Sequence, residues 1–231
     1  MILRGHRLFQ AVIALIIMRM TAAILTGGED WSAERLHNGA PKLPDKFQAK
    51  VKMDIPYKYL QRPMLGLLHY DFHGQRTRED YYSVAFGHTE RVFTSIKLFN
   101  EGKHYQIFHR VKDPALPSPR GCMITPIAAA LPYPSVMQFA VYHGAKNMSL
   151  VAHSEDGDEP LHAVFVNHWV LRFDNVTYDY YESLPNGRPV RLEAPGMNVT
   201  FVHFEPGEHT TPANLFVPEA VASTSCTPIG S

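Results

Sequence analysis

Histidine is the residue type through which this chain could most readily bind metal or transfer protons, because it has 13 of them. On one strand His69 and His73 would share a face, and so would His203 and Glu205. Neither pair has the spacing of a known set of metal ligands. We therefore expect partly exposed histidines on strand faces, no metal site and no cofactor.

The densest acidic segment, residues 154–159, could offer carboxylates to calcium. It lacks the alternate-residue spacing of an EF-hand loop. The alternative is a solvated hairpin tip, which we favour.

Nucleophilic hydrolysis would need a serine or cysteine held beside a base. The chain contains no Gly-X-Ser-X-Gly elbow and no glycine-rich phosphate loop. Serine, histidine and aspartate occur in any chain of this length, so their presence alone predicts no triad. We expect a protein that is not an enzyme.

Cys122 and Cys226 are the only cysteines. They could be one buried and one exposed thiol, or form a bridge between two chains. In an oxidising compartment a lone pair favours an intramolecular disulfide. Closing so long a loop would stabilise the fold by about 4 kcal/mol in the chain-entropy description.

The N-terminus has the order of a secretory signal peptide. Arg4 and Arg7 precede an apolar run at 11–18, and small residues follow at 21–23. A membrane-anchoring helix is the alternative, but it needs about 20 apolar residues, and Arg19 interrupts the run. We expect a signal peptide at 1–23 and a mature protein without a transmembrane anchor, secreted or in the lumen of the secretory or lysosomal pathway.

Three Asn-X-Ser/Thr triplets follow, at Asn147, Asn175 and Asn198, and none has proline at the middle position. An occupied triplet must face solvent. We expect a glycoprotein.

The composition indicates one globular domain without a nucleic-acid partner. Hydrophobic residues make up 45% of the chain, and 22 basic residues balance 22 acidic ones, so no basic footprint for nucleic acid exists. We expect an extended N-terminal arm at 24–46, one β-rich domain at 47–226 and a short tail at 227–231.

Short segments of alternating polarity separated by turn residues predict the fold. Residues 47–54 alternate clearly, 64–72 follow, and the polar residues 73–79 predict a hairpin turn. Further strands are expected at 81–86, 91–99, 104–109, 161–173, 176–184, 188–193 and 197–204. Residues 127–143 could form short helical pieces around the prolines at 132 and 134. We expect a mainly β fold, a strongly curved antiparallel sheet or open half-barrel with one or two short helices.

The segment 161–173 is apolar on both sides. Phe165, Trp169 and Leu171 alternate with Val166 and Val170. Such a strand must be covered on both faces, either as a sandwiched core strand or as the lining of an apolar cavity.

Several fragments, in this order, resemble the ependymin-related and eukaryotic LolA-like secreted proteins. They are Phe47-Gln-Ala-Lys-Val, Leu68-His-Tyr-Asp with Arg76 and Arg78, Tyr105-Gln-Ile before Cys122, His168-Trp, Tyr180-Tyr leading to Gly187-Arg-Pro, and Phe201-Val-His-Phe before Leu215-Phe and the last cysteine. The resemblance implies an open half-barrel, partly covered by helix, with an apolar cavity for a lipid and no catalytic residues. Ependymins are linked with calcium and extracellular matrix and carry more cysteines than the two here. This chain departs from the family in its number of cysteines.

Alternation, together with outward-facing Asn175 and Asn198, predicts the residues that line one face of the sheet. They are Leu68, Tyr70, Val92, Ile96, Val176, Tyr178, Val199 and Phe201. The leading hypothesis is a binding protein for a hydrophobic small molecule or lipid. The alternatives are an extracellular adhesion or recognition protein that uses the sheet as a scaffold and, less favoured, a luminal hydrolase.

Overall fold

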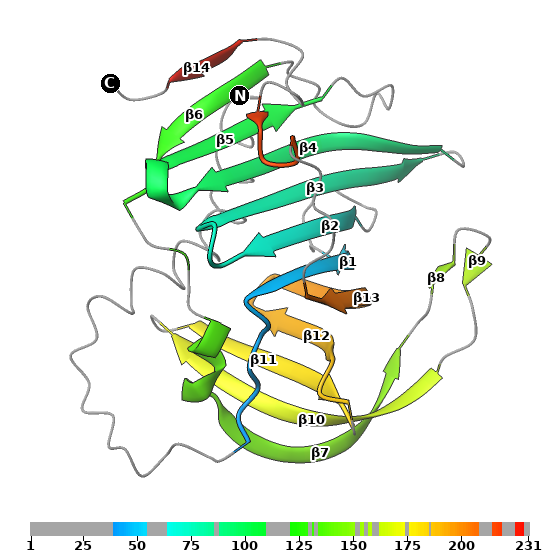
Figure 1. Ribbon diagram of the computed structural model, residues 1–231. Helices are drawn as coiled ribbons and strands as arrows, with labels where there is room; N and C mark the ends of the chain where they lie inside the picture. The colour runs from blue at the N-terminus through cyan, green and yellow to red at the C-terminus, as the bar shows by residue number, and fades with distance from the viewer. Residues whose placement is uncertain are drawn as a thin grey trace.

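The computed structural model describes most of the chain from Gly39 onward (Figure 1). The described residues are 39–54, 64–85, 88–109, 121–128, 131, 134–150, 153–154, 157–158, 162–173, 176–184, 186–207, 214–218 and 225–228. The expected signal peptide at 1–23, most of the expected arm, and Asn175 lie outside these ranges.

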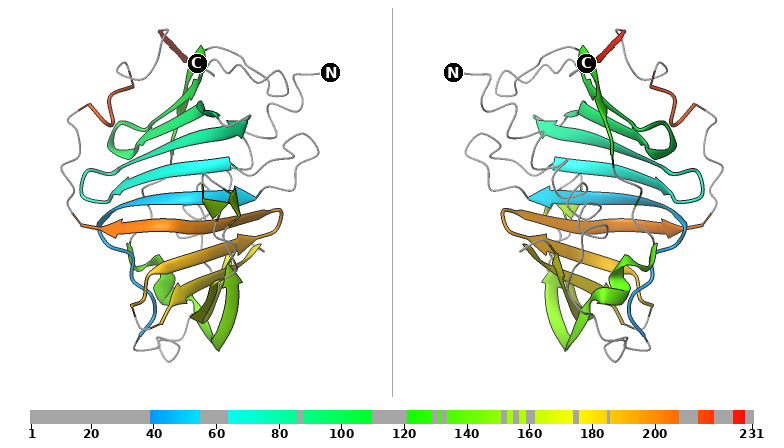
Figure 2. Two further views of the ribbon diagram at one scale, coloured as in Figure 1. Left: turned by 90° about the vertical axis from the view of Figure 1, so that its right-hand side faces the viewer. Right: turned by 90° about the vertical axis from the view of Figure 1, so that its left-hand side faces the viewer.

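Twelve strands form one large open sheet. They are β1 (Lys46–Asp54), β2 (Met64–Asp71), β3 (Arg76–Ala85), β4 (His88–Leu98), β5 (Lys103–Phe108), β6 (Gly121–Pro126), β7 (Val141–Leu150), β10 (His162–Phe173), β11 (Val176–Ser183), β12 (Pro189–Ala194), β13 (Met197–Pro206) and β14 (Cys226–Pro228). Their order is β14-β6-β5-β4-β3-β2-β1-β13-β12-β11-β10-β7. Figure 2 shows this order from green β6 near the top, through blue β1 and orange β13, to the yellow-green strands below. The predicted mainly β, antiparallel fold is confirmed.

A separate two-stranded hairpin pairs β8 (His153–Ser154) with β9 (Gly157–Asp158). It falls in the acidic segment, where the sequence predicted a hairpin.

The helical segments differ from the prediction. Among the described residues there is no α-helix, only the 3-10 helices η2 (Phe99–Glu101) and η3 (Pro134–Phe139). The second lies within the stretch where short helices were expected. It starts at Pro134, because proline is tolerated in the first turn of a helix but not in its interior. The edge strand β7 begins two residues after η3 ends.

The turn between β2 and β3 is shorter than the polar run 73–79 predicted. Asp71 closes it, because its Oδ1 accepts a hydrogen bond from the Gly74 backbone N–H at 2.8 Å and its Oδ2 pairs with the Arg76 guanidinium at 2.9 Å. Residues 76–79 therefore belong to β3, where polar side chains alternate between the two faces of the sheet.

The strand register assigns side chains to two faces, which we call the Val51 face and the Lys52 face after neighbouring residues of β1. Opposed residues of antiparallel strands point to the same side. Val51 pairs with Gly66 and Phe201, whereas Lys52 pairs with Leu65 and Thr200. The face to which every other strand residue points follows from these pairs and from the register of the next strands.

Among the described residues, four bulges interrupt this alternation. Each inserts one residue into one strand of a pair: Val92 in β4, Val190 in β12, Val202 in β13 and His143 in β7. A bulge bends its strand and increases the local twist. In Figure 1, β7 and β10 bend into an arc at the bottom of the molecule, with η3 beside one end of it.

The Val51 face carries most of the apolar core. One cluster spans β1, β2 and β13 and reaches Phe93 and Phe108. A second lies on β10 and β11, where Trp169 and Leu171 pack under Met137 and Ala140 of the η3 region. On the opposite side of β10, Val166 packs with Tyr181 and Val190. The expectation that this strand is covered on both faces is confirmed for Val166, Trp169, Val170 and Leu171, whereas Phe165 is 50% exposed.

The Lys52 face of β4–β6 is covered by residues 214–218, which we call the C-terminal segment. Phe216 packs with Ile96, Ile107 and Cys122. Arg78 donates to the Leu215 carbonyl at 2.7 Å and also to Asp80. A buried guanidinium thus joins the sheet to the backbone of the segment that covers it.

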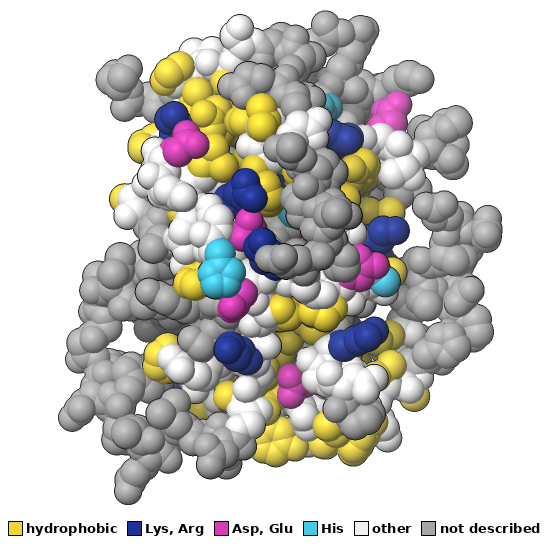
Figure 3. Space-filling model, in the orientation of Figure 1, with side chains coloured by type: hydrophobic (Ala, Val, Ile, Leu, Met, Phe, Trp, Pro, Cys, Tyr) yellow, Lys and Arg dark blue, Asp and Glu magenta, His cyan; other side chains and the backbone are white. Residues whose placement is uncertain are grey.

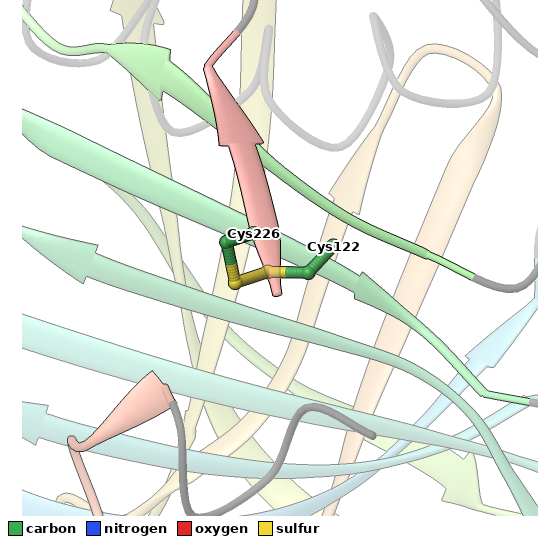
Figure 4. Close-up of a disulfide and its surroundings, with 2 residues drawn as sticks. All are labelled: Cys122 and Cys226. Atoms are coloured by element: carbon green, nitrogen blue, oxygen red, sulfur yellow. A yellow bond between two sulfur atoms is a disulfide. The ribbon is translucent and has the colours of Figure 1, made fainter. Parts of the chain in front are cut away.

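The predicted disulfide between Cys122 and Cys226 is confirmed (Figure 4). The two Cα atoms are 4.3 Å apart, and the residues are directly opposed in the parallel pair β14–β6. The bond holds β14 at the edge of the sheet and closes a loop of 103 intervening residues. No helix among the described residues is long and apolar enough to span a membrane.

The first prediction concerns this bond. The double variant Cys122→Ser/Cys226→Ser should unfold more easily by up to about 4 kcal/mol, because the unfolded chain regains the entropy of the open loop. Urea unfolding of the variant, of wild type and of reduced wild type measures this. Reduced wild type should match the variant, and an unchanged urea midpoint would contradict the role given to the bond.

Candidate functional site

The structure brings most of the predicted lining residues together on the Val51 face. Those that share it are Leu68, Tyr70, Val176, Tyr178, Val199 and Phe201. Leu68, Val199 and Phe201 belong to the cluster around Val51, and Val176 and Tyr178 to the cluster under η3. Leu192 contacts both clusters and joins them.

Ile96 does not belong to this set. The bulge at Val92 shifts the phase of β4, so Phe93 rather than Ile96 points to the Val51 face. Ile96 is completely buried on the Lys52 face beneath Phe216. Val92 is the inserted residue itself and still packs against the cluster around Val51. Strict alternation failed here because the sequence carries no sign of the bulge.

These apolar residues differ in exposure. Val199 and Tyr178 are buried, whereas Leu68, Tyr70, Val176 and Phe201 are partly exposed. Aromatic rings follow the same face, with Phe47 stacked on Tyr70 at 4.9 Å between centroids and 5.1 Å from Phe204. The apolar surface therefore runs across the strands from β2 to β11.

On β3, β4 and β5 two rows of the Val51 face are polar, whereas the row of Tyr81, Phe93 and Phe108 belongs to the apolar cluster. One cross-strand row holds Thr77, Lys97 and His104, and the next holds Glu79, Ser95 and Gln106. All six side chains are buried. We call these six residues the polar cluster.

An ion pair lies within the polar cluster. Lys97 Nζ is 2.9 Å from Glu79 Oε1, and both side chains are 95% or more buried. Tyr81 donates its hydroxyl to the other carboxylate oxygen at 2.7 Å. Burying two charges is costly, and mutual pairing plus further hydrogen bonds offsets that cost.

His104 connects the rest of the polar cluster. Its Nε2 lies 3.0 Å from Ser95 Oγ, and its Nδ1 lies 3.4 Å from the Gln106 amide nitrogen. Burial, and then the positive charge of Lys97, lower the pKa of His104 from 6.5 to about 3. A group with so low a pKa is a weak general base, so the Ser95–His104 pair is poorly suited to activating a nucleophile.

Two atoms of the polar cluster have no hydrogen-bond partner. They are Thr77 Oγ1 and Gln106 Oε1, in side chains that are 7% and 6% exposed. Leaving a buried polar atom unpaired costs about 1–3 kcal/mol, and native proteins contain few such atoms. They are therefore candidates for contact with a ligand.

Sequence reasoning missed the polar cluster. His104 was expected to be partly exposed like the other histidines, but it is 3% exposed. In the sequence, Thr77 and Glu79 lie in phase with Tyr81, and Ser95 and Lys97 lie in phase with Phe93. The presence of polar residues on the same strand faces as these aromatic residues was the only signal in the sequence. It predicts a buried polar cluster only once the register of the three strands is known.

The other expected sites are placed as follows. Among the described residues, no group of three or more His, Cys, Asp or Glu side chains could hold a metal ion. His203 hydrogen-bonds to Glu205 on the exposed part of β13. Asn147 is exposed on β7, and Asn198 is partly exposed on the Lys52 face.

Comparisons with known proteins show no family to which the chain belongs. No protein-family profile and no curated protein matches it. Among solved structures, an uncharacterized conserved protein from Thermus thermophilus aligns with a TM-score of 0.44 and 11% identity, over 85% of this chain and 96% of that one. PNGF-II aligns with a TM-score of 0.32 and 8% identity, over 80% of this chain and 31% of that one. Both TM-scores are below 0.5, so neither alignment indicates a shared activity.

The buried His104 predicts a pH dependence of stability. Its pKa is about 3 in the folded protein and near 6.5 in the unfolded chain, so the unfolded chain binds more protons between these values. The free energy of unfolding should therefore fall as the pH is lowered from 6.5 towards 3, by up to about 1.4 kcal/mol per pH unit from this group.

Urea unfolding at a series of pH values gives the free energy of unfolding as a function of pH. Between pH 6.5 and 3 this free energy should change less steeply with pH for His104→Gln than for wild type. The control His143→Gln changes an exposed histidine and should keep the wild-type slope. Equal slopes for wild type and His104→Gln would show that His104 is not held neutral by burial.

Proposed function

We propose that this protein is a secreted or luminal glycoprotein that binds a hydrophobic, lipid-like ligand in the concavity of its curved sheet. The observation that carries the proposal is the continuous apolar surface of the Val51 face, on which Leu68, Val176 and Phe201 are partly exposed. A single open sheet has no large partner sheet to cover such a surface, and an apolar ligand can cover it.

The dimensions agree with such a ligand. Neighbouring strands are about 4.8 Å apart, so the path over β2, β1, β13, β12 and β11 is about 19 Å long. This is comparable to an extended long acyl chain. Burying each CH₂ of that chain contributes about 0.8 kcal/mol to binding.

The secretory part of the proposal is supported by the disulfide and by Asn147. Disulfides persist in oxidising compartments. The Asn147 side chain is exposed on edge strand β7, as an occupied glycosylation site requires. A glycan there would also hinder pairing of the sheet edge with another chain.

Membership in the ependymin-related and LolA-like proteins is part of the same proposal. That resemblance implies one open antiparallel sheet with an apolar face. It also implies a half-barrel form and a helical cover, which are part of this proposal. Here η3 is the helical segment that packs on the Val51 face.

A recognition scaffold is the second candidate, and a different surface favours it. Tyr142 and Phe165 point to the same side of the β7–β10 pair at the edge of the sheet, and they are 39% and 50% exposed. In Figure 3, hydrophobic side chains gather at the bottom of the molecule, where Figure 1 places β7 and β10. An exposed apolar edge is typical of a protein-binding surface.

Two neighbouring residues of β13 allow a matched test of ligand binding. Phe201 points to the Val51 face, whereas Val202 is the inserted residue of a bulge and is 60% exposed. Phe201→Asp should weaken binding of the uncharged fluorophore N-phenyl-1-naphthylamine at least about tenfold, because a carboxylate is costly to place beside an apolar ligand. Val202→Asp should bind it as wild type does.

Circular dichroism and thermal unfolding check that both variants are folded. Should Phe201→Asp not fold, Leu68→Trp replaces it, since added bulk on a partly exposed side chain blocks the surface without burying a charge. Wild-type protein that does not bind the fluorophore, or equal binding by the two aspartate variants, would leave the scaffold as the better account.

A further inference from the structure

The unpartnered atoms of the polar cluster are arranged for a ligand that carries hydroxyl groups. Gln106 Oε1 can only accept a hydrogen bond, whereas Thr77 Oγ1 can donate or accept. If the Gln106 amide is turned over, its nitrogen takes the unpartnered position instead. Thr77 lies on β3 and Gln106 on β5, so each would need its own hydroxyl group. A hydroxyl group both donates and accepts, so it can satisfy Thr77, and a second one can satisfy Gln106 in either orientation.

The remaining groups of the polar cluster are already engaged. Both carboxylate oxygens of Glu79 accept hydrogen bonds, one from Lys97 and one from Tyr81. Both ring nitrogens of His104 have partners. A ligand is therefore recognised through Thr77 and Gln106, and the ion pair need not be broken to admit it.

The charge of the polar cluster favours an uncharged ligand. Lys97 and Glu79 cancel, and His104 is neutral at physiological pH because burial lowers its pKa. An anionic head group would have to compete with Glu79 for Lys97 while losing its own hydration. A neutral hydroxyl group loses far less hydration on entering a buried site.

The polar cluster adjoins the apolar surface along the same cross-strand rows. One row runs from Phe47 through Tyr70 to Thr77, and the next from Ala49 through Leu68 to Glu79. Polarity changes in both rows between β2 and β3. A molecule lying across the strands thus meets polar side chains at one end and apolar ones along the rest.

We propose that the Val51 face binds an uncharged amphiphile, with a hydroxyl-bearing head group at Thr77 and Gln106 and an apolar chain over β2, β1, β13, β12 and β11. This inference rests on the proposed function, because it names the class of ligand for the same surface. It excludes a free fatty acid as the preferred ligand.

Displacement of N-phenyl-1-naphthylamine from the full-length protein tests the inference with four competitors. These are 1-monooleoylglycerol, methyl oleate without a hydroxyl, oleate with a charge, and glycerol without a chain. The monoacylglycerol should compete with an apparent Kd at least about tenfold lower than methyl oleate or oleate, about the difference that one good hydrogen bond makes. Glycerol alone should not compete.

Thr77→Val assigns the preference to the polar cluster. Because the Thr77 hydroxyl has no partner, the variant should unfold at the wild-type temperature or above, while its preference for the monoacylglycerol falls at least about threefold. Gln106→Met should reduce the preference in the same way and serves if Thr77→Val does not fold. The control Thr89→Val makes the same change at an exposed position on the Lys52 face and should keep the preference.

The outcomes separate the two proposals. Fluorophore binding with equal competition by the monoacylglycerol and methyl oleate, or with tighter binding of oleate, overturns the inference and leaves the proposed function standing. Competition by glycerol as strong as by the monoacylglycerol also overturns it, because the ligand would then be a free polyol. A preference that survives in both variants overturns the assignment to Thr77 and Gln106. Failure to bind the fluorophore and all the lipids overturns both.

Discussion

A large open sheet has two faces, and each apolar face must be covered by something other than a second sheet of similar size. On the Lys52 face the C-terminal segment supplies the cover over β4–β6, held by Phe216, by the Arg78 guanidinium and by the disulfide to Cys226. On the Val51 face η3 covers β10 and β11. Between β2 and β12, partly exposed apolar side chains remain, and the proposed ligand completes the cover there.

The polar cluster is the feature that an ordinary packed core does not explain. A sheet stabilised only by apolar burial would place leucine or valine at positions 79 and 97, since replacing a buried ion pair by packed apolar residues is often neutral or stabilising. Here the ion pair and His104 are satisfied internally, and two neighbouring atoms are not. Thr77 Oγ1 and Gln106 Oε1 are therefore left able to form hydrogen bonds with a ligand at the polar end of an apolar surface. Recognition of one end of an amphiphile accounts for both properties together.

Alternation and turn chemistry predicted much of the sheet, because these depend on neighbours in the sequence. Phe47 to Asp54 has a clear period of two and forms β1, and the lone pair of cysteines was sufficient to predict the disulfide. The strand with Ile96 was found, but its face was wrong, because a single inserted residue at Val92 reverses every side chain that follows. Strands β6, β7 and β14 have weak alternation and were not predicted. The polar cluster could not be derived, since it depends on the register of three strands at once.

Native mass spectrometry of the protein purified from its own source, followed by organic extraction, tests the central claim most directly, because it asks what occupies the Val51 face without adding a probe. The account predicts a population heavier than the glycosylated chain by the mass of one small molecule, which the solvent releases as an uncharged lipid with at least one hydroxyl group. Protein that carries nothing extractable, or that releases only fatty acids or other anions, would contradict it.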